Sequence, residues 1–385
     1  MLGGIVVGVG TMIGGMVYYR RRQRQRRRIR EGLLELIGDT PMVELTSLSA
    51  LTGCRILAKA EYLNPGGSPK DRVARALVQA ALEREGSEIQ RIYEGTSGST
   101  GISLARVAAA AGLQAVIYMP SDQAVEKANL LATLGASVHR VPPVSIVDPA
   151  HYVNAARSAA EADPAGVFAD QFETDANWRA HYESTGPEIW DQTGGDVDAV
   201  IMAAGTGGTL AGVAAYLDEV SGGRVQAYLV DPQGSALYYA VTKGVCYSPT
   251  QDEGRRKRNQ VDTIVEGIGL YRRTANFDRA MQAGLDGAYR CSDQEALHMS
   301  RLLLAREGLF LGSSSAVNCV GALKLARDLG PGHTIVTILC DDGSRHLTKL
   351  WSPEFIQAQG LSPPDPELGE LELLTSEASR QRSES

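Results

Sequence analysis

The chain carries a lysine, Lys70, directly after a turn built from glycine and proline. Residues 64–72 read Asn-Pro-Gly-Gly-Ser-Pro-Lys-Asp-Arg and follow an apolar, strand-like run at 55–60. Ser68 is a favourable N-cap and Pro69 a favourable first helical residue, which predicts that a helix begins at this turn. A lysine held at a helix mouth can lose its proton and attack an aldehyde as a free amine. Lys70 is therefore a candidate for covalent amine chemistry, and a solvated first-turn lysine is the simpler alternative.

A second candidate site is the hydroxyl-rich turn at residues 94–101, which reads Glu-Gly-Thr-Ser-Gly-Ser-Thr-Gly. It lies between a strand-like run at 91–93 and an alanine-rich segment that begins at Ile102. Hydroxyl groups and free backbone N–H groups at a helix N-terminus bind carboxylate or phosphate groups. The turn therefore predicts an anion site, with a well-capped turn that binds nothing as the alternative.

A third candidate is the glycine-rich turn at residues 205–209, Gly-Thr-Gly-Gly-Thr, between a strand-like run at 199–203 and a helical segment. It lacks the Gly-Lys-Ser/Thr ending of a P-loop and the G-x-G-x-x-G spacing of a dinucleotide site. Without these features, the turn offers a cluster of backbone N–H groups and two hydroxyls. Such a cluster suits the single phosphate of a bound cofactor better than the phosphates of ATP. A run of three serines at 313–315 follows another junction between a strand and a helix. If one of these hydroxyls contacted a nitrogen of a heterocyclic ring, that nitrogen would stay unprotonated, because the hydroxyl carries no charge.

The elements that must position these turns alternate along the chain. Apolar runs at 115–119, 199–203 and 334–339 are separated by amphipathic helical segments. Such alternation predicts an α/β fold with parallel-rich sheets flanked by helices, and ligand sites at the carboxyl ends of the strands. Because 385 residues exceed the usual size of one hydrophobic core, we expect two lobes that share a cleft. The five cysteines are scattered without C-x-x-C spacing, so we predict neither a disulfide framework nor a metal site.

The first thirty residues form a separate unit. Residues 2–19 are uncharged and apolar, and as a helix they would extend about 27 Å, barely enough to span a bilayer. Eight arginines follow within residues 20–30. Positive charge after the apolar run indicates an anchor rather than a cleaved signal, with the body of the protein in the cytosol. We interpret the arginines as topology and lipid contact, and we predict no nucleic acid partner.

These features predict the following organisation. We expect a transmembrane anchor at 1–19 that contacts the lipid bilayer through residues 2–19, and a basic juxtamembrane segment at 20–32. A catalytic domain follows at 33–360, with a smaller mobile lobe at about 75–175, and a disordered acidic tail at 361–385. A polar surface insertion is expected at 248–260. The short, glycine-rich anchor favours a single-pass position in the mitochondrial outer membrane, with the ER membrane or a soluble matrix protein as alternatives.

Together, the motifs resemble those of the fold-type II pyridoxal-phosphate enzymes, in particular the cysteine synthase and cystathionine β-synthase group and its fungal-type, membrane-anchored members. Residues 64–72 are similar to the Schiff-base lysine motif of this group, and residues 205–209 to its phosphate loop. Further matches stand in family order at Gln171-Phe172, 181–190, Gly267-Ile268-Gly269 and Ser314. The resemblance covers about residues 37–351, so it implies the two-lobed fold shared with the tryptophan synthase β subunit, and a homodimer.

The resemblance also implies a role for each matched residue. Lys70 would bind pyridoxal 5'-phosphate covalently and later act as acid and base at the Cα atom of the substrate. The residues implied to hold the cofactor are Ser99, Gly205, Thr206, Gly207, Gly208 and Thr209, with Ser314 facing the pyridine nitrogen. The residues implied to bind the amino acid substrate are Thr96, Ser97, Thr100, Gln171 and Gly267.

The implied reaction is a β-replacement, in which an activated serine such as O-acetylserine takes up sulfide and gives cysteine. A serine at the pyridine nitrogen limits electron withdrawal and favours β-chemistry. Cysteine desulfhydrase, a serine or threonine dehydratase, and a non-catalytic membrane scaffold that binds the cofactor are the alternatives. Cystathionine β-synthase itself is less expected, because neither a haem-binding extension nor a regulatory domain pair is evident.

The sequence departs from the family pattern at several positions. Ser99 replaces an asparagine that contacts the 3'-oxygen of the cofactor, and Ala316 replaces a glycine after the serine run. Residues 270–276 and 340–346 also diverge. Arg272 or Arg273 could reach an anionic substrate, although a surface position is the simpler interpretation. These departures leave the cofactor prediction intact and the choice of substrate open.

Overall fold

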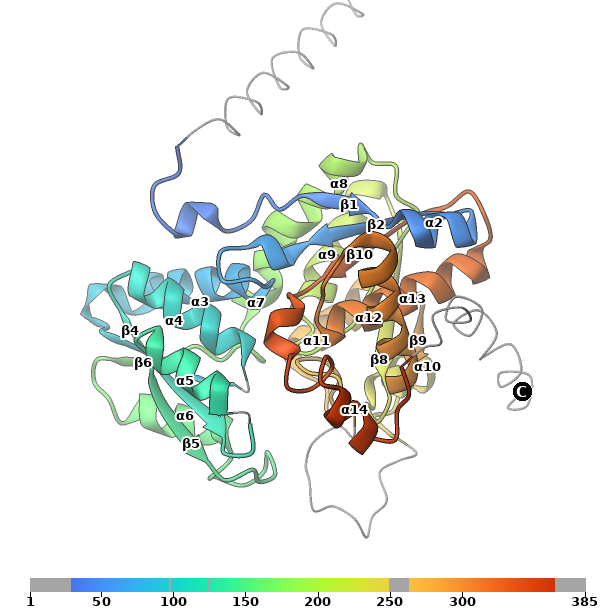
Figure 1. Cartoon of the computed structure of the whole chain (residues 1–385). Coiled ribbons are helices and arrows are strands. Elements are labelled where there is room, and N and C mark those ends of the chain that lie inside the picture. Colours follow the sequence, from blue (N-terminus) through green and yellow to red (C-terminus); the bar gives the residue numbers. More distant parts are fainter. Residues whose placement is uncertain (1–28, 97, 124, 249–262, 364–385) are drawn as a thin grey trace, which may run out of the picture.

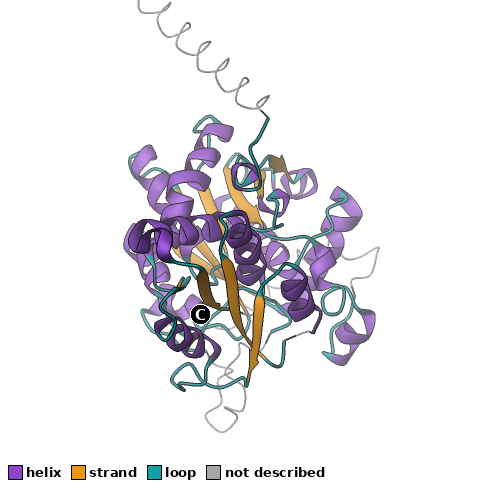
Figure 2. Cartoon of the chain, turned by 90° about the vertical axis from the view of Figure 1, so that its left-hand side faces the viewer, coloured by secondary structure: helices purple, strands orange, loops and turns teal. Residues whose placement is uncertain are grey.

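Figure 1 shows the chain as a computed structural model, which describes residues 29–96, 98–123, 125–248 and 263–363. The predicted anchor, Ser97, and most of the predicted insertion and acidic tail lie outside these residues. The described residues form two lobes, each with its own sheet covered by helices (Figures 1 and 2). The α/β fold with parallel-rich sheets is therefore confirmed.

The sheet of the large lobe has six strands in the order β1-β2-β10-β7-β8-β9. Only β1 runs antiparallel to its neighbour, and the other adjacent pairs are parallel. The central strands are buried along their whole length because helices cover both faces of the sheet. The strands are β1 (Met42–Glu44), β2 (Arg55–Ala60), β7 (Ala199–Met202), β8 (Gln226–Pro232), β9 (Gly287–Cys291) and β10 (Thr334–Leu339).

Side chains alternate between two cores on the two faces of this sheet, with the period of two that a β-strand imposes. Ala199 and Ile201 belong to one core, and Val200 and Met202 to the other. The first core includes side chains from α2 (Thr46–Thr52), α12 (Asp293–Glu307), α13 (Ser313–Leu329) and α14 (Pro353–Ala358). The second includes side chains from α8 (Gly186–Thr193), α9 (Gly208–Ser221), α10 (Leu237–Lys243) and α11 (Ala275–Ala283).

The small lobe has a fully parallel sheet of four strands in the order β5-β4-β3-β6. Its strands are β3 (Arg91–Gly95), β4 (Gln114–Pro120), β5 (Ser137–Val141) and β6 (Gly166–Phe168). Its helices are α3 (Lys70–Glu85), α4 (Ser99–Ala110), α5 (Val125–Thr133) and α6 (Tyr152–Glu161). A helical segment returns the chain to the large lobe through α7 (Asp175–Ala180) and a π-helix (His181–Thr185). Short 3-10 turns lie at Leu34–Leu36, Glu61–Leu63, Gly86–Glu88 and Gly343–His346.

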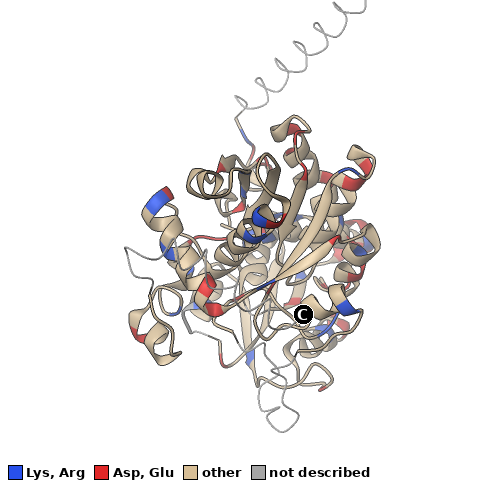
Figure 3. Cartoon of the chain, turned by 90° about the vertical axis from the view of Figure 1, so that its right-hand side faces the viewer, with Lys and Arg blue, Asp and Glu red and all other residues tan. Residues whose placement is uncertain are grey.

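Acidic and basic residues are interspersed on the side of the molecule that Figure 3 presents. Among the helices that the structure describes, none is long and apolar enough to cross a membrane. The anchor predicted at 1–19 falls outside that part of the chain.

Candidate active site

One cavity lies where the carboxyl ends of β7 and β10 meet the beginning of α3. Its lining includes Lys70, the turn from Gly205 to Gly207, Thr209, Asn318 and Cys340. The lysine and the glycine-rich turn are far apart in sequence, and the fold brings them to the same space. The two motifs that predicted an amine and a phosphate site therefore share one cavity.

Lys70 is the first residue of α3, and short-range contacts fix the turn before it. The Ser68 hydroxyl accepts a hydrogen bond from the backbone N–H of Lys70 at 3.3 Å. The Asp71 carboxylate accepts bonds from the Gly66 N–H and the Ser103 hydroxyl. The helix begins one residue later than predicted, since Pro69 precedes it.

The Lys70 side chain has the electrostatic surroundings of a reactive amine. Burial lowers its pKa, while the nearby Cys340 and Asp341 act in the opposite direction. A lower pKa increases the fraction of unprotonated amine, which is the form that attacks a carbonyl carbon. Lys70 is thus suited to covalent chemistry with an aldehyde.

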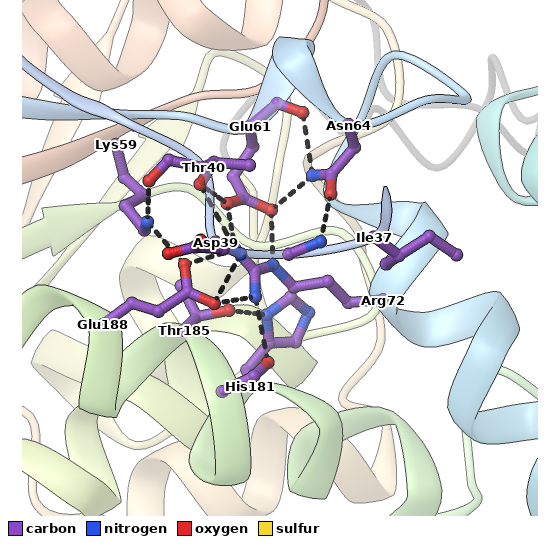
Figure 4. Close-up of polar contacts among 12 residues, drawn as sticks. Ile37, Asp39, Thr40, Lys59, Glu61, Asn64, Arg72, His181, Thr185 and Glu188 are labelled. Atoms are coloured by element: carbon purple, nitrogen blue, oxygen red, sulfur yellow. Dashed lines mark hydrogen bonds and ion pairs between the residues drawn. The ribbon is translucent and has the colours of Figure 1, made fainter. Parts of the chain in front are cut away.

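A buried cluster of charges fixes α3 to the large lobe two residues beyond Lys70 (Figure 4). The Arg72 guanidinium is fully buried and donates to both oxygens of Glu61, each at 2.8 Å. It also donates to the two oxygens of Glu188, at 2.6 and 2.8 Å. Lys59, also fully buried, contacts Glu188 at 2.5 Å. Two cations and two carboxylates therefore balance, and they join β2, α3 and α8 behind the reactive lysine.

The turn at 205–209 is packed too closely for any residue but glycine at several positions. Gly207 has a φ of +89°, in the left-handed region. A Cβ atom at Gly205 would lie 2.3 Å from the carbonyl oxygen of Gly267, and one at Gly208 would lie 2.0 Å from Oδ1 of Asn177. The turn leads directly into α9, whose first N–H groups and dipole favour an anion. This arrangement suits a phosphate group.

His181 supports the same turn from the π-helix. Its ring nitrogens lie 2.9 Å from Oγ1 of Thr185 and 3.2 Å from Oγ1 of Thr209. Burial lowers the pKa of His181 to about 3, so the ring stays neutral. The histidine therefore orients the Thr209 hydroxyl without adding a charge. The sequence had matched this residue to the family without assigning it a role.

Ser314 lies one contact away from the cavity. It is the second residue of α13, it is buried, and its hydroxyl bonds to the Cys340 thiol. Burial raises the pKa of that thiol to about 12, so it stays protonated. Asn318 accepts a bond from the Ala203 N–H and donates to the carbonyl of Ile338, both at 2.7 Å. Sequence reasoning missed Cys340 and Asn318 as cavity residues, and it singled out 340–346 only as divergent.

The residues expected to bind the substrate form a second cluster, at the start of α4. Oγ1 of Thr100 donates to Oε1 of Gln171 at 2.5 Å. Oγ1 of Thr96 accepts a bond from the Gly98 N–H at 3.2 Å. Ser99 begins α4, directly after Gly98. The fold thus brings Thr96, Ser99, Thr100 and Gln171 together, and Ser97 lies outside the described residues.

A carboxyl group that the sequence left without a role supports this cluster. Glu94 accepts hydrogen bonds from Gly95 N at 2.9 Å and from Gln171 N at 3.1 Å. Burial raises the pKa of Glu94 to about 8, against the effect of these bonds. Glu94 is therefore uncharged at neutral pH, and it holds Gln171 without repelling an anion.

Three side chains that sequence reasoning missed contact these clusters, and one of them, Asn177, contacts both. Nδ2 of Asn177 donates to the Gln171 carbonyl at 2.7 Å and to Oγ1 of Thr206 at 2.9 Å. Thr274 donates to the Thr206 carbonyl at 2.7 Å. Asn276 donates to the Gln171 carbonyl at 3.3 Å. Two of the three, Thr274 and Asn276, belong to the stretch at 270–276. The divergence of this stretch from the family pattern was the only sequence signal that pointed to them.

The two arginines of that stretch have surface partners. Arg272 donates to Glu173 at 2.8 Å, and its guanidinium lies over the ring of Phe172. Arg273 forms an ion pair with Asp278. Neither arginine lines the cavity, which agrees with the simpler interpretation of these residues.

Comparison with known proteins identifies the class to which this fold and cavity belong. The family model described as "Pyridoxal-phosphate dependent enzyme" matches residues 33–341. The chain is 52% identical over 346 residues to "Cysteine synthase 2" of Schizosaccharomyces pombe, which covers 87% of each protein. It is 49% identical over 354 residues to the "Putative mitochondrial cysteine synthase" of Saccharomyces cerevisiae, with 89% of each covered. The chain therefore belongs to the family of pyridoxal-phosphate dependent enzymes.

A solved structure shows the same fold. The crystal structure of an O-acetylserine dependent cystathionine beta-synthase from Helicobacter pylori matches with a TM-score of 0.73 and 31% sequence identity. The match covers 84% of this chain and 98% of that protein.

The residues around the cavity fit pyridoxal phosphate. Lys70 supplies an amine that lines the cavity and has a lowered pKa, and the glycine turn at the start of α9 lines the same cavity, where the N–H groups of a helix N-terminus favour a phosphate. Ser314 supplies a neutral hydroxyl from the opposite element. The cofactor predicted from the sequence agrees with the family and with these residues.

Proposed function

We propose that this enzyme forms L-cysteine from O-acetyl-L-serine, or a related activated serine, and sulfide by pyridoxal-phosphate dependent β-replacement. The observation that carries the proposal is the shared cavity of Lys70 and the turn at 205–209, in a chain about half identical to cysteine synthases. Those relatives match over most of their length.

The residues assigned to the cofactor act as follows. Lys70 would hold the cofactor through its aldehyde carbon, and its amine would move the proton at the Cα atom of the substrate. Gly205, Thr206, Gly207, Gly208 and Thr209 would bind the phosphate, and Ser314 would offer its hydroxyl to the pyridine nitrogen. Ser99 takes the place of the asparagine in the family pattern. When bound, the cofactor supplies an electron sink for negative charge at Cα.

The residues assigned to the substrate lie beside this site. Thr96, Ser97 and Thr100 bind the amino acid carboxylate with the N–H groups at the start of α4, and Gln171 completes the site. Gly267 borders it from the large lobe, since its carbonyl oxygen packs on Gly205. Uncharged Glu94 keeps this carboxylate site free of a competing negative charge.

The proposal extends to the assembly and location of the enzyme. We propose that it is a homodimer and that the lobe at about 75–175 moves relative to the rest of the domain. We further propose that residues 1–19 anchor it in the mitochondrial outer membrane, with the catalytic domain in the cytosol. The apolar segment and the arginines after it support the anchor, and the name of the S. cerevisiae relative, which calls it mitochondrial, supports a mitochondrial location. Removal of residues 1–30 should release the protein from membranes without changing its cofactor spectrum.

Rapid mixing of the purified holoenzyme with O-acetylserine tests the reaction. We expect the cofactor absorbance to shift to longer wavelength and to return on addition of sulfide, with cysteine as the product. Sulfide release from cysteine, with no response to O-acetylserine, would assign the desulfhydrase reaction instead. No response to any amino acid would favour a scaffold that binds the cofactor without catalysis.

A further inference from the structure

An ion pair crosses between the two lobes beside the proposed substrate site. Nζ of Lys127, on α5 of the small lobe, lies 2.7 Å from Oε1 of Glu266 in the large lobe. The two side chains are 21% and 15% exposed, so bulk salt screens the pair less than a surface pair. Neither residue takes part in the proposed chemistry.

Each end of the pair adjoins a turn that contacts the proposed substrate. On the small-lobe side, a Cβ atom at Gly98 would lie 3.7 Å from Nζ of Lys127. Gly98 is the residue before α4, in the middle of the turn that binds the carboxylate. On the large-lobe side, Glu266 immediately precedes Gly267, whose carbonyl oxygen packs on Gly205. The ion pair therefore connects the two walls between which the amino acid binds.

The large lobe fixes Glu266 independently of Lys127. Nζ of Lys349 lies 2.8 Å from the same Oε1 atom, and Nδ1 of His346 lies 3.3 Å from Oε2. The backbone N–H of Glu266 donates to Oγ of Ser313 at 3.1 Å. Burial opposes ionisation of Glu266, but His346, Lys127 and Lys349 outweigh it and hold its pKa well below the usual range.

His346 keeps its own positive charge at neutral pH. Burial lowers its pKa, but Asp341, at 3.0 Å from Nε2, and Glu266 raise it to about 9. Without Lys127, Glu266 would thus still face two cations from its own lobe. The loss of Lys127 would therefore remove the connection between the lobes, while the Glu266 carboxylate would keep the cations of its own lobe as partners.

We propose that Lys127 is a positioning residue for the amino acid substrate, and that its pair with Glu266 holds Gly98 and the start of α4 against the loop at 267–269. The inference rests on the proposed function, because it assigns the carboxylate of the substrate to the turn at 96–100. Lys127 acts through these two turns and takes no part in proton transfer.

Lys349 provides a matched control, because it contacts the same oxygen of Glu266 from within the large lobe. In the holoenzyme, we expect Lys127→Met to raise the KM for O-acetylserine by about tenfold and to change kcat less than about threefold. Lys349→Met should change this KM by less than about twofold, and Lys127→Arg should restore most of the affinity, since it keeps the charge. Equal effects of the two methionine variants, or an unchanged KM in Lys127→Met, would overturn the proposal.

Hydrogen exchange gives a second measurement that does not depend on turnover. Without substrate, the amides at 98–104 should exchange faster in Lys127→Met holoenzyme than in the wild type, and remain unchanged in Lys349→Met. Unchanged exchange in Lys127→Met would contradict the proposed connection between the lobes. Failure of the wild type to respond to O-acetylserine would instead refute the proposed function. The hydrogen-exchange result would then still show whether the ion pair connects the two lobes.

Discussion

The buried cluster around Arg72 leads to the most quantitative prediction. In Arg72→Met the apolar volume is largely kept, but the buried cluster is left with one cation, Lys59, for the carboxylates of Glu61 and Glu188. Removing one partner of a buried ion pair destabilises a protein by about 3–5 kcal/mol, because the remaining charge has no compensation. We therefore expect the variant to lose about that much free energy of unfolding at neutral pH.

The pH dependence gives an independent value for the same cluster. Burial alone would raise the pKa of Glu61, but Arg72, with smaller contributions from Lys59 and Thr40, outweighs it and lowers the pKa from 4.5 to about 2. Because the folded-state pKa is depressed, this stabilisation is present above pH 4.5 and is lost as the pH falls toward 2. The shift corresponds to about 3 kcal/mol for the wild type. In Arg72→Met this loss at acid pH should largely disappear.

Urea unfolding followed by tryptophan fluorescence, at pH 7 and pH 3 and at one cofactor concentration, measures both effects. Arg91→Met is the matched control, because Arg91 forms a comparable pair with Asp163 and is 35% exposed. Exposed pairs contribute little to stability, so the control should lose far less than Arg72→Met. Equal losses in the two variants, or an acid dependence that persists in Arg72→Met, would refute the reasoning.

Two further predictions concern the site itself. Gly205→Ala places a Cβ atom 2.3 Å from the Gly267 carbonyl oxygen, so we expect roughly tenfold to hundredfold weaker retention of the cofactor. Absorbance of the cofactor after dialysis measures this retention. Retention equal to the wild type would show that the loop adjusts freely and would contradict the prediction. The pKa of Glu94 is raised to about 8, so it ionises beside the carboxylate site above that pH, and the KM for O-acetylserine should then rise. In Glu94→Gln that rise should be absent from the pH profile, and an identical profile in both enzymes would exclude Glu94 as its cause.

The sequence predicted those parts of the site that depend on contiguous residues. The turns at 64–72 and 205–209 each combine glycines, caps and a flanking strand within ten residues, so their local structure and their chemistry are visible in the chain. The joint cavity follows from the strand–helix alternation, because parallel strands place their carboxyl-terminal turns at one edge. The grouping of Thr100 with Gln171 required the family resemblance, since the two residues are far apart in sequence.

The rest of the site depends on contacts that no local pattern encodes. Asn177 bridges Gln171 and Thr206 from a helix whose sequence resembles any amphipathic segment. Cys340 has the appearance of an ordinary buried cysteine until the fold places it beside Lys70 and Ser314. Lys127 and Glu266 pair only because α5 of the small lobe and the loop before Gly267 in the large lobe meet at this point. Long-range packing therefore determines which polar residues complete the site.

The central claim is that Lys70 carries the cofactor of a cysteine-forming enzyme. Borohydride reduction of the purified holoenzyme, followed by peptide mass spectrometry, tests it most directly. We predict a pyridoxyl phosphate group on the peptide that contains Lys70, and neither this group nor the visible cofactor absorbance in Lys70→Ala. A pyridoxyl group on a different lysine, or an unmodified Lys70 in protein that retains the cofactor, would contradict the claim.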